Sequence, residues 1–331
     1  MYRATRWTTR GAVFSSFLAF CSVAFAFQHD GPLVSAAPRT NLVPTSPENR
    51  PIADLRVDVH LVEIPVHVTT PLGASVTNLQ KGNFRVFEDG VEQEITHFAM
   101  DDAPLSIGLV FDSSGSMARK IRKSAEAAAA FFKTANSDDE FFLVEFNERP
   151  KLAVPFTRNS DEIYKRIVRA KPMGRTSLLD AIRLSLSQMK DAQNLRKAVV
   201  IFSDGGDNRS RYTETEVMEA MREADVQVYA MGIFDLDGRK ATLEERNGPQ
   251  LLANLAEETG GRHFPVDNLE DLPGVCARIG NELRNQYLLG YAPTNAGRDG
   301  KYRRVKVVLK DPENTPPLRA YHRQGYYAPS Q

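Results

Sequence analysis

Five oxygen-bearing side chains have the types and spacing of ligands for a hard metal ion. Residues 107–116 read IGLVFDSSGS, an apolar run followed by Asp112, Ser114 and Ser116 as Asp-x-Ser-x-Ser. A second apolar run, in VVIFSDGGDN at 199–208, leads to Asp204. Thr176 lies between them, just before a segment with helical periodicity. If both runs are strands of a doubly wound sheet, these side chains lie at the carboxyl ends of strands, where such sheets bind ligands.

The chemistry that this set favours is the binding of Mg²⁺. This ion takes about six oxygen ligands in near-octahedral geometry and usually keeps several of them as water. The two carboxylates balance its charge, and the three hydroxyls add none. The ion therefore remains able to accept one more anionic oxygen. We expect this oxygen to come from an external carboxylate.

Each segment also has a purely structural interpretation. Asp-Ser-Ser-Gly-Ser is a common start of a helix, since Ser and Asp cap helix N-termini readily. Ser-Asp-Gly after a strand is often only a turn, and Thr176 is also a suitable helix cap. All three segments occur together, each at the end of a strand or the start of a helix, and this conjunction favours the metal site.

Short apolar runs alternate with amphipathic segments from Leu105 onward. We expect strands at 105–111, 140–146, 151–155, 198–203, 226–233 and 262–266, and helices near 117–135, 160–170, 178–191, 214–224, 249–259 and 268–286. This order predicts an α/β fold with a doubly wound, mostly parallel sheet. The connection from Asn147 to Lys151 is too short for a parallel crossover, so one edge strand must be antiparallel.

Residues on both sides of this region have β patterning. In the segment 54–104, apolar residues alternate from Val57 to Val68, and Asp89-Gly90 predicts a hairpin before a strand at Ile95–Phe98. In the segment 287–331, strands are expected at 287–291, 302–309 and 318–327. Few strands are stable alone. The two segments are therefore expected to form one small β-sandwich, with the α/β domain (105–286) inserted in it.

The segment 105–286 resembles a von Willebrand factor type A (VWA) domain with a metal-ion-dependent adhesion site (MIDAS). Asp112, Ser114 and Ser116 match its Asp-x-Ser-x-Ser element, and Thr176 and Asp204 match its threonine and second aspartate. LAEETGG at 255–261 resembles the family segment before the last strand. The flanking β segments and YLLGYAP at 287–293 resemble exported VWA-related proteins of soil bacteria such as acidobacteria.

The resemblance implies a mechanism. Such domains bind Mg²⁺ or Mn²⁺ and take a Glu or Asp of a partner as the last ligand. In their low-affinity state the second aspartate, here Asp204, binds the metal directly and the threonine, here Thr176, binds through water. The high-affinity state exchanges these roles as the last helix moves. That helix would be 268–286, which leads directly into the C-terminal strands.

Four further polar residues lie near the predicted ligands. Asp180, Asp207 and Asn208 are candidates for orienting ligands or waters, although solvated turn and helix positions explain them equally well. Arg175, next to Thr176, is a candidate for attracting an acidic partner.

The first residues have the pattern of an export signal. Three arginines precede an apolar run from Gly11 to Phe27, and Ala24-x-Ala26 predicts cleavage after Ala26. The predicted organisation is thus a signal peptide (1–26) and a flexible linker (27–53), with a periplasmic or extracellular mature chain that lacks a transmembrane segment. The run is short for a membrane anchor, and bulky Phe20 disfavours lipidation at Cys21. Cys276 is then unpaired, and a buried apolar role is expected.

Other classes of function receive little support. The chain has no P-loop, Gly-x-Ser-x-Gly or His-Glu-x-x-His motif, and its scattered histidines lack zinc-ligand spacing. We therefore do not expect an enzyme. The formal net charge is zero without a prominent basic cluster, which argues against nucleic acid as a partner. The remaining alternative is an envelope or assembly scaffold that does not use the metal. The partner's identity and the oligomeric state are left open.

Overall fold

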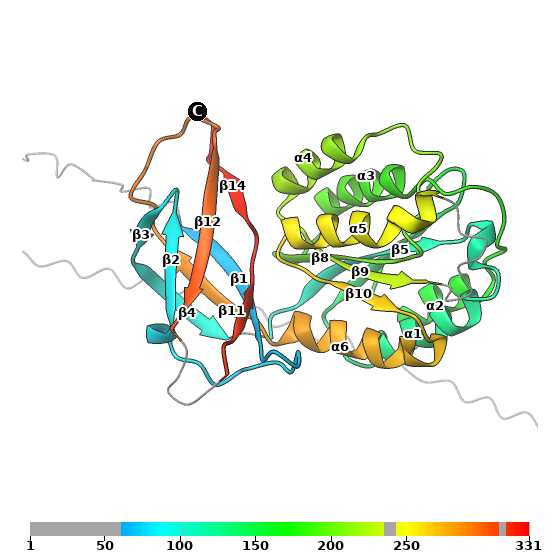
Figure 1. Cartoon of the computed structure of the whole chain (residues 1–331), viewed down its shortest axis with the longest axis horizontal. Coiled ribbons are helices and arrows are strands. Elements are labelled where there is room, and N and C mark those ends of the chain that lie inside the picture. The colour runs from blue at the N-terminus through cyan, green and yellow to red at the C-terminus, as the bar shows by residue number, and fades with distance from the viewer. Residues whose placement is uncertain (1–60, 101, 235–242, 311–315, 331) are drawn as a thin grey trace, which may run out of the picture. The chain divides into compact units, whose positions relative to one another are not determined.

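The computed structural model describes residues 61–100, 102–234, 243–310 and 316–330 (Figure 1). The predicted leader, the predicted linker and the start of the first β segment, up to residue 60, lie outside the described residues. No helix in the described ranges is both long and apolar enough to cross a membrane.

A six-stranded sheet with the order β10-β9-β8-β5-β6-β7 forms the centre of the α/β region. Its strands are β5 (Leu105–Asp112), β6 (Glu140–Phe146), β7 (Lys151–Thr157), β8 (Arg196–Ser203), β9 (Gln227–Ile233) and β10 (His263–Val266). All pairs are parallel except β6 with β7. The predicted mostly parallel sheet with one antiparallel edge strand is confirmed, and β7 is that strand.

Helices cover both faces of this sheet (Figure 1). They are α1 (Ile121–Phe132), α2 (Ser160–Val168), α3 (Leu178–Gln188), α4 (Glu214–Ala224), α5 (Leu243–Glu258) and α6 (Leu272–Arg284). Apolar residues of α1, α2 and α6 pack with Leu109 and Phe111, whereas those of α3, α4 and α5 pack with Val110. Successive residues of β5 thus point to opposite cores, which explains why the whole strand is buried.

Several helix ends differ from the sequence prediction. A 3₁₀ turn (Gly115–Met117) includes the end of the Asp-x-Ser-x-Ser motif, and α1 begins only at Ile121. Another 3₁₀ turn (Leu269–Asp271) precedes α6. The helix expected near 249–259 begins at Leu243, and Pro249 lies within it, where proline removes one backbone hydrogen bond. Such turns and prolines make helix ends the least predictable part of a pattern.

The flanking segments form two four-stranded sheets, with the orders β13-β1-β11-β4 and β14-β12-β2-β3. Their strands are β1 (Val62–Thr69), β2 (Phe84–Glu88), β3 (Val91–Gln93), β4 (Ile95–Met100), β11 (Tyr287–Tyr291), β12 (Tyr302–Leu309), β13 (Arg319–Tyr321) and β14 (Gly325–Tyr327). The strands on the two sides of the α/β region pair with each other, β1 and β4 with β11, and β2 with β12.

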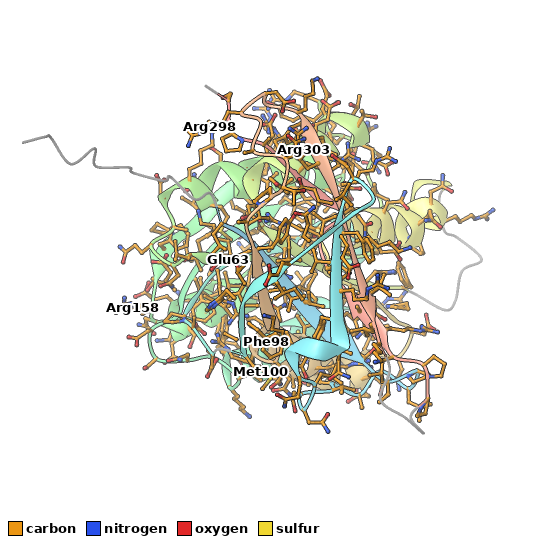
Figure 2. All side chains as sticks on the ribbon, turned by 90° about the vertical axis from the view of Figure 1, so that its left-hand side faces the viewer. Glu63, Phe98, Met100, Arg158, Arg298 and Arg303 are labelled. Atoms are coloured by element: carbon orange, nitrogen blue, oxygen red, sulfur yellow. The ribbon has the colours of Figure 1, made fainter. Side chains whose placement is uncertain are left out.

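An apolar core lies between these two antiparallel sheets. It contains Ile64 of β1, Val86 of β2 and Leu289 of β11, all fully buried. Phe98, which is labelled in Figure 2, packs against Phe84 and Tyr287, and its ring centroid lies 5.7 and 5.9 Å from theirs. The expected small β-sandwich is therefore present.

One strand prediction in the sandwich was wrong. The segment 318–327 is not a single strand but β13 and β14, which belong to different sheets. The chain leaves β13 at His322, whose Nε2 accepts a hydrogen bond from the amide of Val307 at 3.2 Å, and joins the second sheet at Gly325. A side chain at 325 would lie 2.2 Å from the carbonyl oxygen of Arg303, so only glycine fits there.

Candidate metal centre

The five predicted ligands come from segments that meet at one end of the parallel sheet. Asp112 is the last residue of β5, and Asp204 directly follows β8, the neighbouring strand. Thr176 lies two residues before α3. Backbone hydrogen bonds join these loops: the amide of Gly115 donates to the carbonyl of Gly174 at 3.1 Å, and the amide of Met173 to that of Ser113 at 3.0 Å.

Asp112 is fully buried, and both of its carboxylate oxygens accept hydrogen bonds. Oδ1 accepts the amide of Ser114 at 2.8 Å, and Oδ2 accepts the hydroxyl of Ser203 at 2.6 Å. Burial raises the pKa of Asp112 to about 7, and the nearby carboxylate of Asp204 contributes to this shift. The two carboxylates repel one another in a place with little water, so a cation between them would be stabilising.

The hydroxyls of Ser114 and Ser116 form a hydrogen bond with each other. Ser114 is buried, Ser116 is exposed, and their Oγ atoms are 3.1 Å apart. Mg–O distances of roughly 2.0–2.1 Å put adjacent octahedral ligands about 2.9 Å apart. The spacing of the two hydroxyls therefore suits neighbouring ligands of one ion.

Thr176 is buried and held through its backbone. Its amide donates to Oδ1 of Asn208 at 3.1 Å, and its carbonyl accepts the amide of Asn208 at 3.1 Å. Asn208 belongs to the loop that follows Asp204, so the loop after β8 positions the threonine at the start of α3. Of the polar neighbours that the sequence singled out, Asn208 is the one that contacts a predicted ligand directly.

Asp207 and Asp180 fasten the same loop to α3 without contacting a predicted ligand. Asp207 accepts the amide of Leu179 at 2.9 Å, and Asp180 accepts the amides of Arg211 and Tyr212 at 2.8 and 3.2 Å. Arg175 is exposed. The carboxylates thus hold the loop, and the loop holds Thr176.

Lys120 was missed by sequence reasoning. Its buried ammonium donates to Oδ2 of Asp204 at 3.2 Å and to the carbonyl of Ile233, at the end of β9, at 2.8 Å. The other oxygen of this carboxylate, Oδ1, is also buried and has no hydrogen-bond partner among the described residues. Lys120 thus compensates one of the two negative charges and leaves an unsatisfied acceptor.

These features fit a divalent cation. The site has one excess negative charge, one orphaned carboxylate oxygen and a pair of hydroxyls at ligand spacing. No group of three or more His, Cys, Asp or Glu able to hold a metal is found in the described part of the chain. The predicted site contains only two residues of these four types, Asp112 and Asp204, because its other three ligands are hydroxyls. It therefore does not count as such a group.

Two glycines let α5 approach the Asp204 loop. A side chain at Gly248 of α5 would lie 2.4 Å from the carbonyl oxygen of Asp204. Gly205, which follows Asp204, has φ +76 and faces the backbone of Gly248. The sequence marks both as glycines but does not reveal that they meet.

Comparison with known proteins agrees with this arrangement. Residues 107–206 match the family model for the von Willebrand factor type A domain. This stretch is therefore similar to a VWA domain. The match includes all five predicted ligand positions.

Individual proteins that are similar to this chain differ from it widely in sequence. An uncharacterized protein of Borreliella burgdorferi is 23% identical over 188 residues, which span 50% of this chain and 55% of that relative. This chain thus matches about half the length of its curated relative. A von Willebrand factor type A protein from Catenulispora acidiphila has a TM-score of 0.48 at 13% identity, covering 74% of this chain and 75% of that one. The vWF domain of a type V pilus tip protein from Porphyromonas gingivalis has a TM-score of 0.45 at 11% identity, covering 55% and 95%.

Proposed function

We propose that this protein is an exported interaction module that captures an acidic residue of a partner protein through a bound Mg²⁺ or Mn²⁺. The observation that carries the proposal is the orphaned Oδ1 of Asp204, which is buried beside Asp112 with one lysine to serve two carboxylates. Burying such an atom without a partner is costly, and a metal ion would remove that cost.

The ion would be held by Asp112, Ser114, Ser116, Thr176 and Asp204, directly or through water. Counting Lys120, these side chains carry one net negative charge, so the site with a divalent ion has a net positive charge. A Glu or Asp of the partner would neutralise it, and its burial is tolerable for that reason. Export rests on the arginine-rich start and the Ala-x-Ala spacing of the first 26 residues. We propose no catalytic activity.

Metal binding is tested by titration calorimetry with MgCl₂. Asp204→Ala and Thr176→Ala should each weaken binding by about tenfold or more while the protein remains folded, since both residues lie outside the apolar cores. Asp138→Ala, an exposed aspartate of the same domain, is the control and should change nothing. Unchanged affinity in both site variants would refute the assigned site.

Partner capture is tested with the whole protein on native envelope extracts. Proteins retained in Mg²⁺ should be released by EDTA and absent when Asp112→Ala is the bait. Ca²⁺ should support retention less well, because it prefers more ligands at longer distances. Equal retention in Mg²⁺, Ca²⁺ and EDTA would favour a metal-independent scaffold instead.

A further inference from the structure

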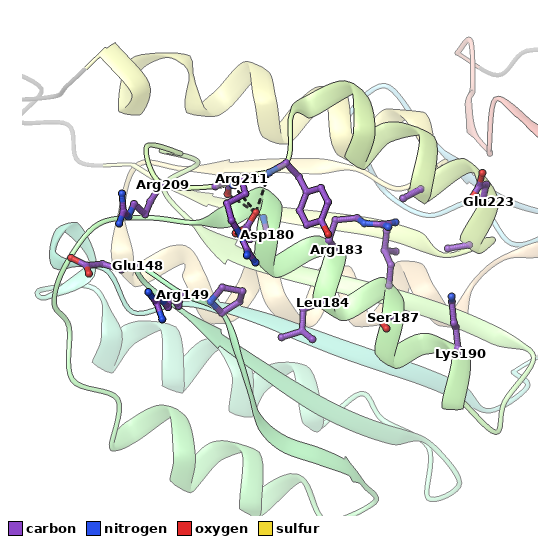
Figure 3. A pocket seen from close by; sticks show the side chains of 16 residues that line it. Glu148, Arg149, Asp180, Arg183, Leu184, Ser187, Lys190, Arg209, Arg211 and Glu223 are labelled. Atoms are coloured by element: carbon purple, nitrogen blue, oxygen red, sulfur yellow. Dashed lines mark hydrogen bonds and ion pairs between the residues drawn. The ribbon is translucent and has the colours of Figure 1, made fainter.

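A cleft of about 1110 Å³ is lined by α3 and by loops that also carry residues of the candidate metal centre. Figure 3 shows the side chains that line it. Its walls come from α3, α4, the turn between β6 and β7, and the loop after β8. Leu184, Leu186 and Ala220 give it an apolar part. It therefore offers both apolar surface and the charged side chains around it to a ligand.

The charges that line this cleft are mostly positive. The cations are Arg149, Arg183, Lys190, Arg209 and Arg211, and the acids are Glu148, Asp180 and Glu223. Asp180 is buried and already accepts hydrogen bonds from two backbone amides and from Nε of Arg211 at 3.3 Å. The whole-chain neutrality therefore hides a local excess of positive charge, which the sequence analysis did not find.

Most of these cations have no acidic partner. Within the described ranges, Arg149, Lys190 and Arg209 make no ion pair, whereas the guanidinium of Arg183 lies over the ring of Tyr212 at 5.3 Å and attracts the carboxylate of Glu216. Unpaired cations around one hollow repel each other, so an anion that enters is attracted by several at once.

The cleft and the metal centre share their walls. Arg209 follows Asn208, whose side chain holds the amide of Thr176. Arg149 lies two residues after Asn147, whose carbonyl accepts the amide and the hydroxyl of Ser177 at 2.9 and 2.7 Å. Figure 3 places Glu148, Arg149 and Arg209 at one end of the cleft and Lys190 and Glu223 at the other. A chain bound along it would thus begin next to the metal centre.

We propose that this cleft receives an acidic segment of the partner polypeptide, adjacent to the residue whose carboxylate binds the metal. The inference rests on the proposed function for the metal contact, and adds the chemistry of the partner: acidic residues interspersed with apolar ones. The apolar lining favours a polypeptide over a sugar or nucleic-acid polyanion, which has few apolar side groups. The chain's own residues 27–56 are a poor occupant, because their three acids are balanced by Arg39, Arg50 and Arg56.

The test uses a fluorescein-labelled synthetic peptide of alternating Glu and Leu and its Gln–Leu counterpart, with fluorescence anisotropy in Mg²⁺ and in EDTA. Arg149→Gln/Arg209→Gln should weaken binding of the Glu peptide roughly three- to tenfold, as expected for the loss of two exposed charge contacts. Lys165→Gln/Arg169→Gln removes the same charge from exposed positions in and just after α2 and should have less than about a twofold effect. Thermal melting verifies that both variants fold.

The outcomes separate the cleft from the metal. If the cleft variant loses binding while the parent protein still binds the Glu peptide in EDTA, the result would support the cleft and count against the metal contact. Loss in EDTA with no effect of the cleft variant would overturn the cleft and leave the proposed function standing. If both double variants weaken binding of the Glu peptide equally, the effect comes from the net charge of the protein, and the cleft proposal is overturned. Tighter, arginine-dependent binding of heparin, a DNA duplex or phosphatidylglycerol vesicles would overturn the polypeptide assignment.

Discussion

The buried carboxylates of the candidate metal centre and the buried carboxylate of Glu282 have contrasting surroundings. At the sheet end, Asp204 pairs with Lys120, and Asp112 has no ion pair among the described residues. Glu282, on α6 where this helix approaches the sandwich, has two cations: Arg262 donates to its Oε1, and Nε of Arg278 lies 3.3 Å from the same atom. The first group has two carboxylates for one cation, and the second has one carboxylate for two cations, although Oε2 of Glu282 also lacks a hydrogen-bond partner among the described residues.

The two arginines that pair with Glu282 also contact segments of the sandwich. The guanidinium of Arg262 lies 4.8 Å from the ring centroid of Phe264 and 4.5 Å from that of Tyr321, and Arg278 donates to the carbonyl of Gly73 at 2.7 Å. These contacts join α6 and β10 to the sandwich segments. The comparison teaches that a buried charge with its counter-charges in place ties structure together, whereas a deficit of counter-charge marks a place for a ligand.

Removing Glu282 should have the largest effect on stability and none on the metal. Glu282→Ala leaves the half-buried guanidinium of Arg262 without its carboxylate, and breaking such a buried pair costs about 3 kcal/mol. Denaturant unfolding should show this loss, while the dissociation constant for Mg²⁺ stays within about twofold. Glu257→Ala, an exposed position of α5, is the control. A change in Mg²⁺ affinity as large as that of Asp204→Ala would show that the two groups are not independent.

Only part of what distinguishes these two groups of charges could be predicted from the sequence. The two buried strands, the antiparallel edge strand and the Asp-x-Ser-x-Ser loop could be predicted, because they depend on local periodicity and on the length of one short connection. The cationic partners could not. Lys120 and Arg262 are ordinary charged residues in the sequence, and only packing brings them to Asp204 and Glu282.

The same limit explains the errors in the sandwich and around α5. The break between β13 and β14 depends on His322 reaching the amide of Val307 in another strand. The close approach of Gly205 to Gly248 joins the loop after β8 to α5. Hydrogen bonds and close approaches between distant segments leave no period in a sequence, so no local pattern can indicate them.

Acid should weaken the Glu282 group through His67. The ring donates from Nδ1 to the carbonyl of Asn285 at 3.0 Å, and its Nε2 lies 3.8 Å from Oε2 of Glu282. Burial lowers the pKa of His67 to about 4, with Arg262 and Arg278 contributing. A depressed histidine pKa contributes stability that is present above the unfolded value of 6.5 and is lost as the pH falls toward about 4.

The expected loss between pH 7 and pH 4.5 is roughly 2 kcal/mol, since most of the shift is expressed over this range. Burial raises the pKa of Glu282, which opposes the effect of His67 on acidification, so the comparison must be made between variants. His67→Gln should flatten the pH dependence of denaturant unfolding, whereas His97→Gln, at an exposed position, should not. Parallel pH profiles for His67→Gln and the parent protein would show that this histidine carries no such cost.

The smallest expected effect comes from removing the positive charge of Lys120 from the candidate metal centre. Lys120→Met keeps an apolar stem of similar length and removes the ammonium that lies 3.2 Å from Oδ2 of Asp204. Without that competitor, both oxygens of Asp204 become unpaired and the site gains a full negative charge. Mg²⁺ should bind about tenfold more tightly, which corresponds to roughly 1.4 kcal/mol.

The variant should also be less stable without metal, because two buried carboxylates then have no cation, and Mg²⁺ should restore its melting temperature. Lys123→Met is the matched control: it removes the same charge from α1, but Lys123 pairs with Glu126 and Glu270 rather than with the site. Calorimetric titration of the three proteins measures the effect directly. Weaker Mg²⁺ binding by Lys120→Met than by Lys123→Met would mean that the lysine positions Asp204 for the ion instead of competing with it, and the deficit of charge would no longer explain the site.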